Sequence, residues 1–156
     1  MTNDISQRLL DANITLPTPP APAANYVPFT IAGSLLTISG QLPMVDGKLI
    51  SIGHVGKDVS VEDAMKAAQI CAINILANAN IALNGDLSRI QQTIRLGGFV
   101  SSAPDFTGHP QIINGASDLI ATILGDAGKH ARFAVGVAAL PLGASVEVDA
   151  QFWIEE

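Results

Sequence analysis

The chain has 156 residues, which is enough for one domain with a substantial core. Hydrophobic residues make up 48% of it and charged residues only 14%, which excludes a disordered protein. The net charge is −6 with only 8 lysine and arginine residues, so the basic patch that nucleic-acid binding needs is missing. So low a charged fraction indicates apolar surface that is hidden by association between chains.

The chain has one cysteine, Cys71, which excludes an internal disulfide and fits a reducing compartment. The first 20 residues lack the basic start and apolar run of a secretory signal. No apolar run approaches the roughly 18 residues that span a bilayer. We therefore predict a cytoplasmic protein that does not interact with membranes.

We predict that residues 1–22 form an arm, which packs across the surface of a domain formed by residues 23–156. A short amphipathic helix is expected within residues 1–15. Its apolar side would carry Ile5, Leu9 and Leu10. Residues 16–22 read LPTPPAP and predict a stiff, extended linker, because proline fixes φ and lacks a backbone donor.

The rest of the chain predicts strands and two long helices. Helical periodicity runs from residue 61 to about 82, with Ser60 as the cap of its first turn. Cys71 lies in the apolar stripe, which favours a buried small hydrophobe over a reactive thiol. Pro110 suits the first position of a second helix that ends at Gly125 or Gly128. The predicted strands are residues 26–32, 34–39, 48–52 and 89–100, followed by two strands within residues 130–156.

This order predicts an α+β fold, a two-layer sandwich in which two helices cover one face of a mixed sheet. The second face has no cover from its own chain, and three or more sheets that meet by these faces would cover it. Gly97 and Gly98 interrupt the strand at residues 89–100 and indicate a bulge or a close approach.

The last 27 residues, 130–156, alternate large apolar side chains with small or charged ones, as strands with two different faces do. We predict a hairpin that turns at residues 141–144, PLGA, and places Leu140 opposite Ser145. In this register the large apolar residues of both strands would share one face and pack on the helices.

The other face of the predicted hairpin would carry Arg132, Glu147 and Asp149 beside small residues. Arg132 and Glu147 would lie about six residues apart along the ladder, roughly 20 Å at ~3.3 Å per residue. Their side chains would not meet within one chain, so a site that uses both needs a neighbouring subunit. We expect this face to line a ligand cleft or a subunit interface.

Several short motifs lie in or beside the predicted strands and in the second helix. Residues 131–137 read ARFAVGV and are followed by Leu-Pro and then by Val-Glu-Val at residues 146–148. Residues 39–43 read SGQLP, Tyr26 heads the first strand, and Asn114 lies in the second helix.

These motifs resemble the RidA/YjgF family, which comprises small trimeric enamine/imine deaminases with a chorismate-mutase-like fold. The family pattern is an arginine that opens the penultimate strand, then Leu-Pro, then a carboxylate in the last strand. The resemblance covers residues 24–154 and implies a homotrimer with sites between subunits.

The resemblance implies that Arg132 holds a substrate carboxylate and that Glu147 positions or activates a water. The other residues that it implies for substrate binding are Tyr26, Ser39, Gly40, Asn114 and Ala134. Two positions depart from the family pattern. Ala134 stands where many members have a cysteine, and His130 stands where proline or alanine is usual.

The loop at residues 101–109 and the N-terminal arm are also longer than in the smallest members. These departures leave open the physiological substrate, the retention of deaminase activity and the role of the arm.

The implied reaction is hydrolysis of a small 2-imino acid, of the 2-iminobutanoate/2-iminopropanoate type, to a 2-keto acid and ammonia. Arg132 would fix the carboxylate, and a water held by Glu147 and a carbonyl near residues 39–40 would attack the imine carbon. Positioning and proton transfer supply the rate, so we predict no metal and no organic cofactor. The three histidines show no metal-ligand spacing.

Three other interpretations remain open. A non-catalytic trimeric binding protein for small carboxylate metabolites would keep Arg132 and tolerate loss of Glu147. Arg132 could also form a structural ion pair across an interface. A ribonuclease or translation-inhibitor role would require a salt-sensitive affinity for RNA, and the acidic balance of the chain argues against it.

Overall fold

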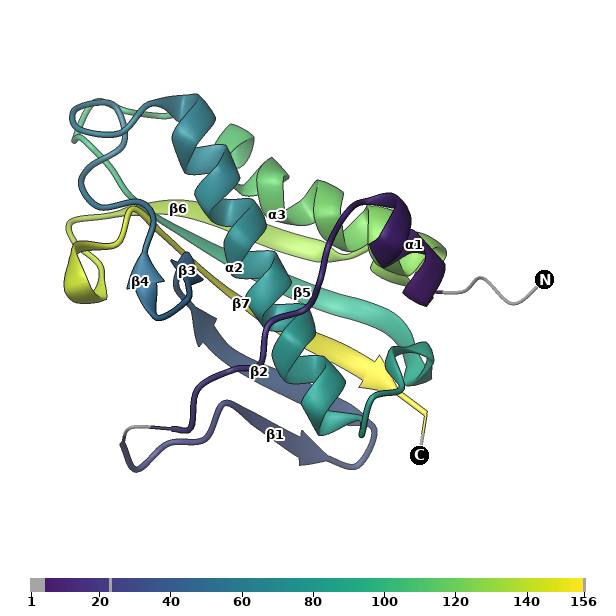
Figure 1. The fold of residues 1–156 in the computed structure, drawn as a ribbon. Helices are drawn as coiled ribbons and strands as arrows, with labels where there is room; N and C mark the ends of the chain where they lie inside the picture. Colours follow the sequence, from purple (N-terminus) through teal and green to yellow (C-terminus); the bar gives the residue numbers. More distant parts are fainter. Residues whose placement is uncertain (1–4, 23, 156) are drawn as a thin grey trace.

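A computed structural model describes residues 5–22 and 24–155 of the chain (Figure 1). The described elements, in chain order, are α1 (Ile5–Asp11), β1 (Phe29–Ala32), β2 (Leu35–Gln41), β3 (Met44–Val45), β4 (Lys48–Leu49), α2 (Val61–Ala82), β5 (Ile90–Ser101), α3 (His109–Leu124), β6 (Ala131–Val137) and β7 (Val146–Ile154).

The expected α+β sandwich is confirmed. Five strands form one sheet in the order β1-β2-β7-β5-β6, and it is mixed because β5 and β6 run parallel while the other pairs are antiparallel. The long helices α2 and α3 lie side by side across one face of this sheet (Figure 1). Their buried stripes and the inward residues of the strands form one hydrophobic core.

The two long helices begin and end close to the predicted residues. Ser60 caps α2, since its hydroxyl accepts a hydrogen bond of 3.1 Å from the backbone N–H of Asp63. Pro110 is the second residue of α3, and Gly125 ends this helix with a φ of 62°. Both ends therefore follow from the local sequence.

Small residues let the layers approach closely. A Cβ on Gly115 of α3 would collide with the backbone carbonyl of Met65 in α2, and a Cβ on Gly98 of β5 would collide with the side chain of Ile113. The two bulges of β5 lie near residues 91 and 94, not at Gly97 and Gly98. Of the two alternatives predicted for these glycines, the bulge is therefore wrong, and the close approach of α3 to β5 explains Gly98.

The first strand is shorter than predicted. It begins at Phe29, because Pro28 has no backbone donor for the ladder. The strand predicted at residues 48–52 is reduced to β4, which pairs with β3 in a small separate hairpin.

The predicted C-terminal hairpin is wrong. The strands β6 and β7 do not pair with each other, because β5 lies between them and bonds to both (Figure 1). The PLGA segment is a short 3-10 turn within a longer crossover, with Leu142 at φ 59° and Gly143 at φ 75°. The pairing of Leu140 with Ser145 that fixed the predicted register therefore does not occur.

This topology also reverses the predicted faces of β6. The helices cover the side of β5 that carries Leu96, Gly98 and Val100. The β6 residues that pair with these three, and so lie on the same side, are Arg132, Ala134 and Gly136. Phe133 and Val135 lie on the uncovered face, and Val135 is 42% exposed. The large apolar residues of β6 are thus the outward ones, while those of β7 face the helices as predicted.

The N-terminal arm packs on the domain. Ile5 and Leu9 of α1 contact the core, whereas Leu10 is 68% exposed. Arg8 ties α1 to α3, because its Nη1 donates a hydrogen bond of 3.1 Å to the carbonyl of Ile123. Within residues 5–22 and 24–155, no helix is both long and apolar enough to cross a bilayer.

Candidate functional site

Arg132 lies on the helix-covered side of β6, an edge strand of the sheet, and α3 determines where its side chain goes. Its Nη1 donates to Asn114 Oδ1 at 2.8 Å and to Ser117 Oγ at 3.1 Å, and its Nη2 donates to the carbonyl of Pro110 at 3.3 Å. Residues 110, 114 and 117 recur at helical spacing on one face of α3. One helix face therefore orients the guanidinium.

These three hydrogen bonds leave part of the guanidinium available. It has five N–H donors, so the Nε–H and the second N–H of Nη2 have no acceptor among the described residues. Arg132 also forms no ion pair with any described carboxylate. The site thus offers an oriented positive charge with unused donors, which is what binds a carboxylate well.

A chain of hydrogen bonds behind Arg132 fixes Ser117. His130 Nδ1 lies 2.6 Å from the carbonyl of Gly128 and therefore carries a hydrogen, while His130 Nε2 lies 2.9 Å from Ser117 Oγ. With neutral His130, the hydroxyl of Ser117 donates to Nε2 and accepts from Arg132. His130, which departs from the family pattern, thus orients Ser117, and Ser117 accepts a hydrogen bond from Arg132.

Glu147 lies on the opposite, uncovered face. Its neighbours Val146 and Val148 are buried towards the helices, so the side chain between them points away. Its carboxyl lies against Gly40, where a Cβ would collide with Oε1. Burial raises the pKa of the Glu147 carboxyl above its ordinary value, and the nearby charge of Asp149 raises it further.

Arg132 and Glu147 do not meet within the described chain. They pair with Leu96 and Phe99 of β5, three residues apart, and β5 separates their strands. Three residues and two strand spacings place their Cα atoms about 14 Å apart. The predicted register and the ~20 Å separation are wrong, and so is the prediction that the two residues share a face, because β6 pairs with β5 and not with β7.

The other residues implied by the resemblance fall into two groups. Asn114 contacts Arg132 directly, and Ala134 lies next along the same side of β6. Ser39 and Gly40 lie in the irregular part of β2, beside Glu147. Tyr26 lies three residues before β1 and is 64% exposed, and it lines the same hollow of about 230 Å³ as Gly40.

The uncovered face also holds Arg95 and two phenylalanines, which contact Asp149 and one another. Arg95 Nη2 donates to Asp149 Oδ2 at 3.1 Å, and the Arg95 guanidinium lies 5.3 Å from the centroid of the Phe133 ring. Phe133 in turn meets Phe99 edge-to-face at 5.3 Å. Asp149 therefore has a structural partner, which leaves Glu147 as the carboxylate of this face without an ion pair among the described residues.

The site includes Ser117 and the carbonyl of Pro110, which sequence reasoning missed. The signal was present for Ser117, because it follows Asn114 by three residues and so lies on the same face of the helix. A backbone carbonyl leaves no trace in the residue type, and only the fold could place the carbonyl of Pro110 near Arg132.

Cys71 is fully buried in α2, as predicted, and burial raises the pKa of its thiol well above the ordinary range. We expect a thiol reagent to leave the native protein unlabelled and to label one thiol per chain after denaturation. The measurement is reagent uptake with and without denaturant. Rapid labelling under native conditions would contradict the buried position.

Comparisons with known proteins identify the family of the chain. Residues 6–151 match the family described as "YjgF/chorismate mutase-like, putative endoribonuclease", and the chain belongs to this family. Protein TCP17 of Trypanosoma cruzi is 44% identical over 147 residues, which cover 94% of this chain and 91% of that protein.

Two solved structures are also similar to this chain. Atu1372 from Agrobacterium tumefaciens is 56% identical, with a TM-score of 0.91 over 97% of this chain and 92% of that one. A Shewanella oneidensis protein named a "putative endoribonuclease" is 36% identical, with a TM-score of 0.93 over 97% of this chain and all of that one (100%). The resemblance drawn from the sequence motifs is confirmed at the level of family and fold.

Proposed function

We propose that the protein hydrolyses small 2-imino acids to 2-keto acids and ammonia, in a homotrimer whose sites lie between subunits. The observation that carries this proposal is the guanidinium of Arg132. It is oriented by three neutral acceptors, it lacks a carboxylate partner among the described residues, and it keeps two donors unused. A substrate carboxylate would complete its hydrogen bonds.

Glu147 is the proposed water activator. A carboxyl with a raised pKa exchanges protons more readily near neutral pH than an ordinary glutamate. It also lies beside Ser39 and Gly40, whose carbonyls could hold the same water. Water attack on the imine carbon gives a carbinolamine, which collapses to the keto acid and ammonia.

Association of subunits would bring Arg132 of one chain close to Glu147 of another. Within one chain Arg132 and Glu147 lie on opposite sides of the sheet, so Glu147 must come from a neighbouring subunit to face Arg132. The uncovered face also exposes apolar groups that association would bury, with Trp153 50% exposed and Val135 42% exposed. A trimer mass in light scattering is the expected result, and a stable monomer would contradict the shared site.

Hybrid trimers test the shared site directly. Arg132→Ala and Glu147→Gln proteins, each inactive alone, are unfolded together and refolded as a mixture. Some interfaces then combine an intact Arg132 with an intact Glu147, so part of the wild-type imine hydrolysis should return. A mixture as inactive as its components would contradict a site between subunits.

The binding-protein alternative makes a different prediction for turnover. Pure protein is added to 2-iminopropanoate that is generated in the assay by an amino-acid oxidase. Faster release of keto acid and ammonia supports an enzyme. Unchanged decay together with tight binding of a keto acid supports the binding protein.

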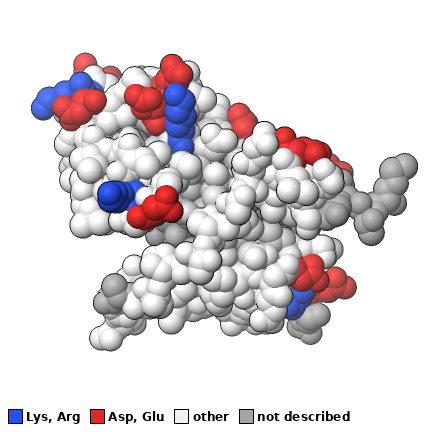
Figure 2. All heavy atoms as spheres, viewed as in Figure 1, with Lys and Arg blue, Asp and Glu red and all other residues white. Residues whose placement is uncertain are grey.

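The family name leaves RNA as a possible ligand of its members, but the charges of this chain give RNA binding little support. On the face shown in Figure 2, basic side chains are few and stand beside acidic ones, as Lys66 does beside Glu62 and Asp63. We expect no RNA binding that weakens as salt rises. A salt-sensitive affinity for single-stranded RNA would contradict this expectation.

Glu147 also makes stability depend on pH. Its pKa is raised by folding, so the folded protein holds this proton more tightly than the unfolded chain. The free energy of unfolding should therefore fall as pH rises from the ordinary glutamate pKa through the raised one. Glu147→Gln removes this loss, and we expect it to be more stable than wild type at neutral pH, by at most about 1 kcal/mol for a half-exposed group.

The measurement is the urea midpoint of both proteins at one fixed concentration, at mildly acidic and at neutral pH. The advantage of the glutamine variant should shrink towards acidic pH. An advantage that grows on acidification would contradict the raised pKa.

A further inference from the structure

A hollow at one end of α3 holds a hydrogen-bonded serine and histidine that the reaction described above does not use. Its volume is about 400 Å³, and Ser102 and His109 line it together with the apolar residues Phe106 and Ala138. This size is within the range of small-molecule sites.

The serine and the histidine are held in a geometry suited to proton transfer. Ser102 Oγ lies 3.0 Å from His109 Nε2, and the Phe106 ring stands edge-on to the imidazole with centroids 5.3 Å apart. The absence of a side chain at Gly136 makes room for the pair. A Cβ there would lie 2.8 Å from Ser102 Oγ and would collide with His109 Nε2.

The hollow and Arg132 belong to the same side of the same strand. Arg132 and Gly136 are four residues apart on β6, about 13 Å, with Ala134 between them. Because α3 runs antiparallel to β6, His109 stands at Gly136 while Ser117 stands at Arg132. The Arg132 side chain covers part of this distance, since its Nη2 reaches the carbonyl of Pro110, the residue after His109.

We propose that this hollow is the second half of the Arg132 site: it receives an apolar substrate side chain, and His109 protonates the imine nitrogen through the hydroxyl of Ser102. This inference rests on the proposed hydrolysis. It adds the proton donor that the reaction requires beside Glu147, and it names the substrate class as 2-imino acids with aliphatic or aromatic side chains.

The protons balance over the two steps. As the water oxygen bonds to the imine carbon, Glu147 takes one water proton. The π pair of C=N moves to nitrogen, which takes a proton from Ser102 Oγ while the imidazolium of His109 replaces it. When the C–N bond of the carbinolamine breaks, two protons are available, one on Glu147 and one on the hydroxyl group. One of them goes to the leaving nitrogen and the other goes to His109. Ammonia leaves, and both groups regain their starting charge.

The apolar lining determines the substrate class. A substrate whose carboxylate lies at Arg132 has its side chain directed either to solvent or along β6 past Ala134 to the hollow beside Gly136. Phe106 and Ala138 line the hollow there. Each methylene that enters such a hollow is worth roughly 10-fold or more in kcat/KM, so the imine of leucine should be hydrolysed at least about 10-fold faster than the imine of alanine.

The test uses the full chain, with His109→Ala and Ser102→Ala beside wild type and Gln111→Ala as the control, because Gln111 is an exposed residue in the same turn of α3. Imines of alanine and leucine are generated in the assay, and the affinity for the matching keto acid is measured separately. We expect His109→Ala and Ser102→Ala to lose about 100-fold or more in kcat, the typical share of general acid catalysis, with keto-acid affinity unchanged. Added imidazole should restore activity to His109→Ala but not to Ser102→Ala.

Two results would overturn the inference while leaving the proposed hydrolysis intact. One is a folded His109→Ala protein that keeps wild-type kcat, or that loses it without rescue by imidazole. The other is wild-type preference for the imine of alanine over that of leucine. A wild-type protein that hydrolyses neither imine overturns the proposed function and this inference together. The wild-type assay alone shows this outcome, before any variant is made.

Discussion

Replacing Arg132 by lysine is expected to lower kcat/KM for imine hydrolysis by about 100-fold or more while the fold persists. Lysine keeps the charge but cannot donate to Asn114, Ser117 and Pro110 and still present two donors to a carboxylate. Losing a bidentate, charge-assisted contact costs about 3 kcal/mol, and each ~1.4 kcal/mol is tenfold in rate.

Arg89→Lys is the matched control. Arg89 donates through Nε at 3.2 Å and Nη2 at 2.9 Å to the carbonyl of Glu155, away from the proposed site. The same exchange there should leave kcat/KM within about twofold of wild type. Binding of a keto acid, followed by calorimetry, should weaken in Arg132→Lys and not in Arg89→Lys. Equal activity of the two variants would remove Arg132 from the site.

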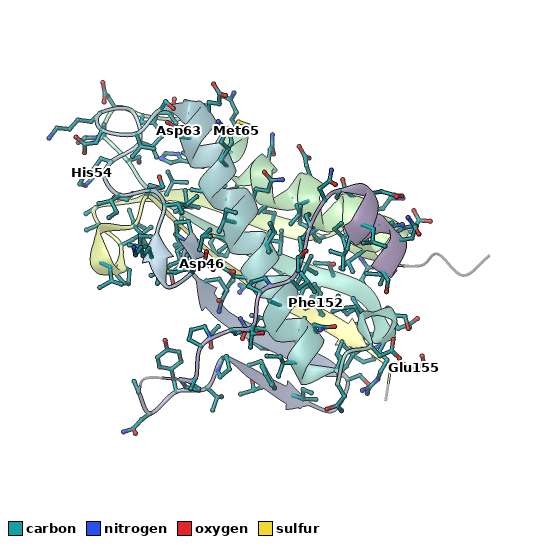
Figure 3. The ribbon with its side chains drawn as sticks, viewed as in Figure 1. Asp46, His54, Asp63, Met65, Phe152 and Glu155 are labelled. Carbon is teal, nitrogen blue, oxygen red and sulfur yellow. The ribbon has the colours of Figure 1, made fainter. Side chains whose placement is uncertain are left out.

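Replacing Phe152 by alanine is expected to lower the free energy of unfolding by about 3–5 kcal/mol. Phe152 is fully buried and points from β7 to the helices (Figure 3). Its removal loses the transfer free energy of a phenyl ring and leaves a cavity that two long helices cannot close. A small domain has only about 5–15 kcal/mol of stability, so this variant should be near the limit of folding.

The neighbouring residue supplies the control, because alternation puts it on the other face. Trp153 is 50% exposed in the single chain, so Trp153→Ala should cost little in intrinsic stability. Its effect should appear in association, as a trimer that dissociates at higher protein concentration. Urea unfolding measures the first effect and light scattering the second. A similar loss of stability in both variants would contradict the assignment of faces in β7.

The part of the fold that local chemistry determines was predictable. The Ser60 cap, the helical period around Cys71 and the Pro110 start fixed both helices to within a residue or two. The alternation in β7 also named its inward face correctly. These signals act between residues close in sequence, where propensity and capping decide the conformation.

Strand pairing was not predictable in the same way. Alternation shows that β6 has two different faces, but it does not show which strand pairs with it or which face meets the helices. The structure inserts β5, from some forty residues earlier in the chain, between β6 and β7, which follow each other in the chain. That choice depends on the parallel crossover through α3, a contact over long sequence distance.

In the candidate site, too, sequence motifs identify some residues, while contacts between distant segments determine how the side chains meet. Arg132, Glu147 and Asn114 were named from motifs, and the structure brings Arg132 and Asn114 into contact but not Glu147. The contacts of Ser117 and His130 with each other and with Arg132 depend on how α3 lies along β6, so the sequence alone does not give them.

The placement of Arg132 and Glu147 on opposite sides of the sheet has a kinetic consequence. An active centre that takes one group from each of two chains exists only in the assembled state, so its quantity follows mass action. Specific activity would then not be constant on dilution. It would fall once the protein concentration drops below the dissociation constant of the assembly.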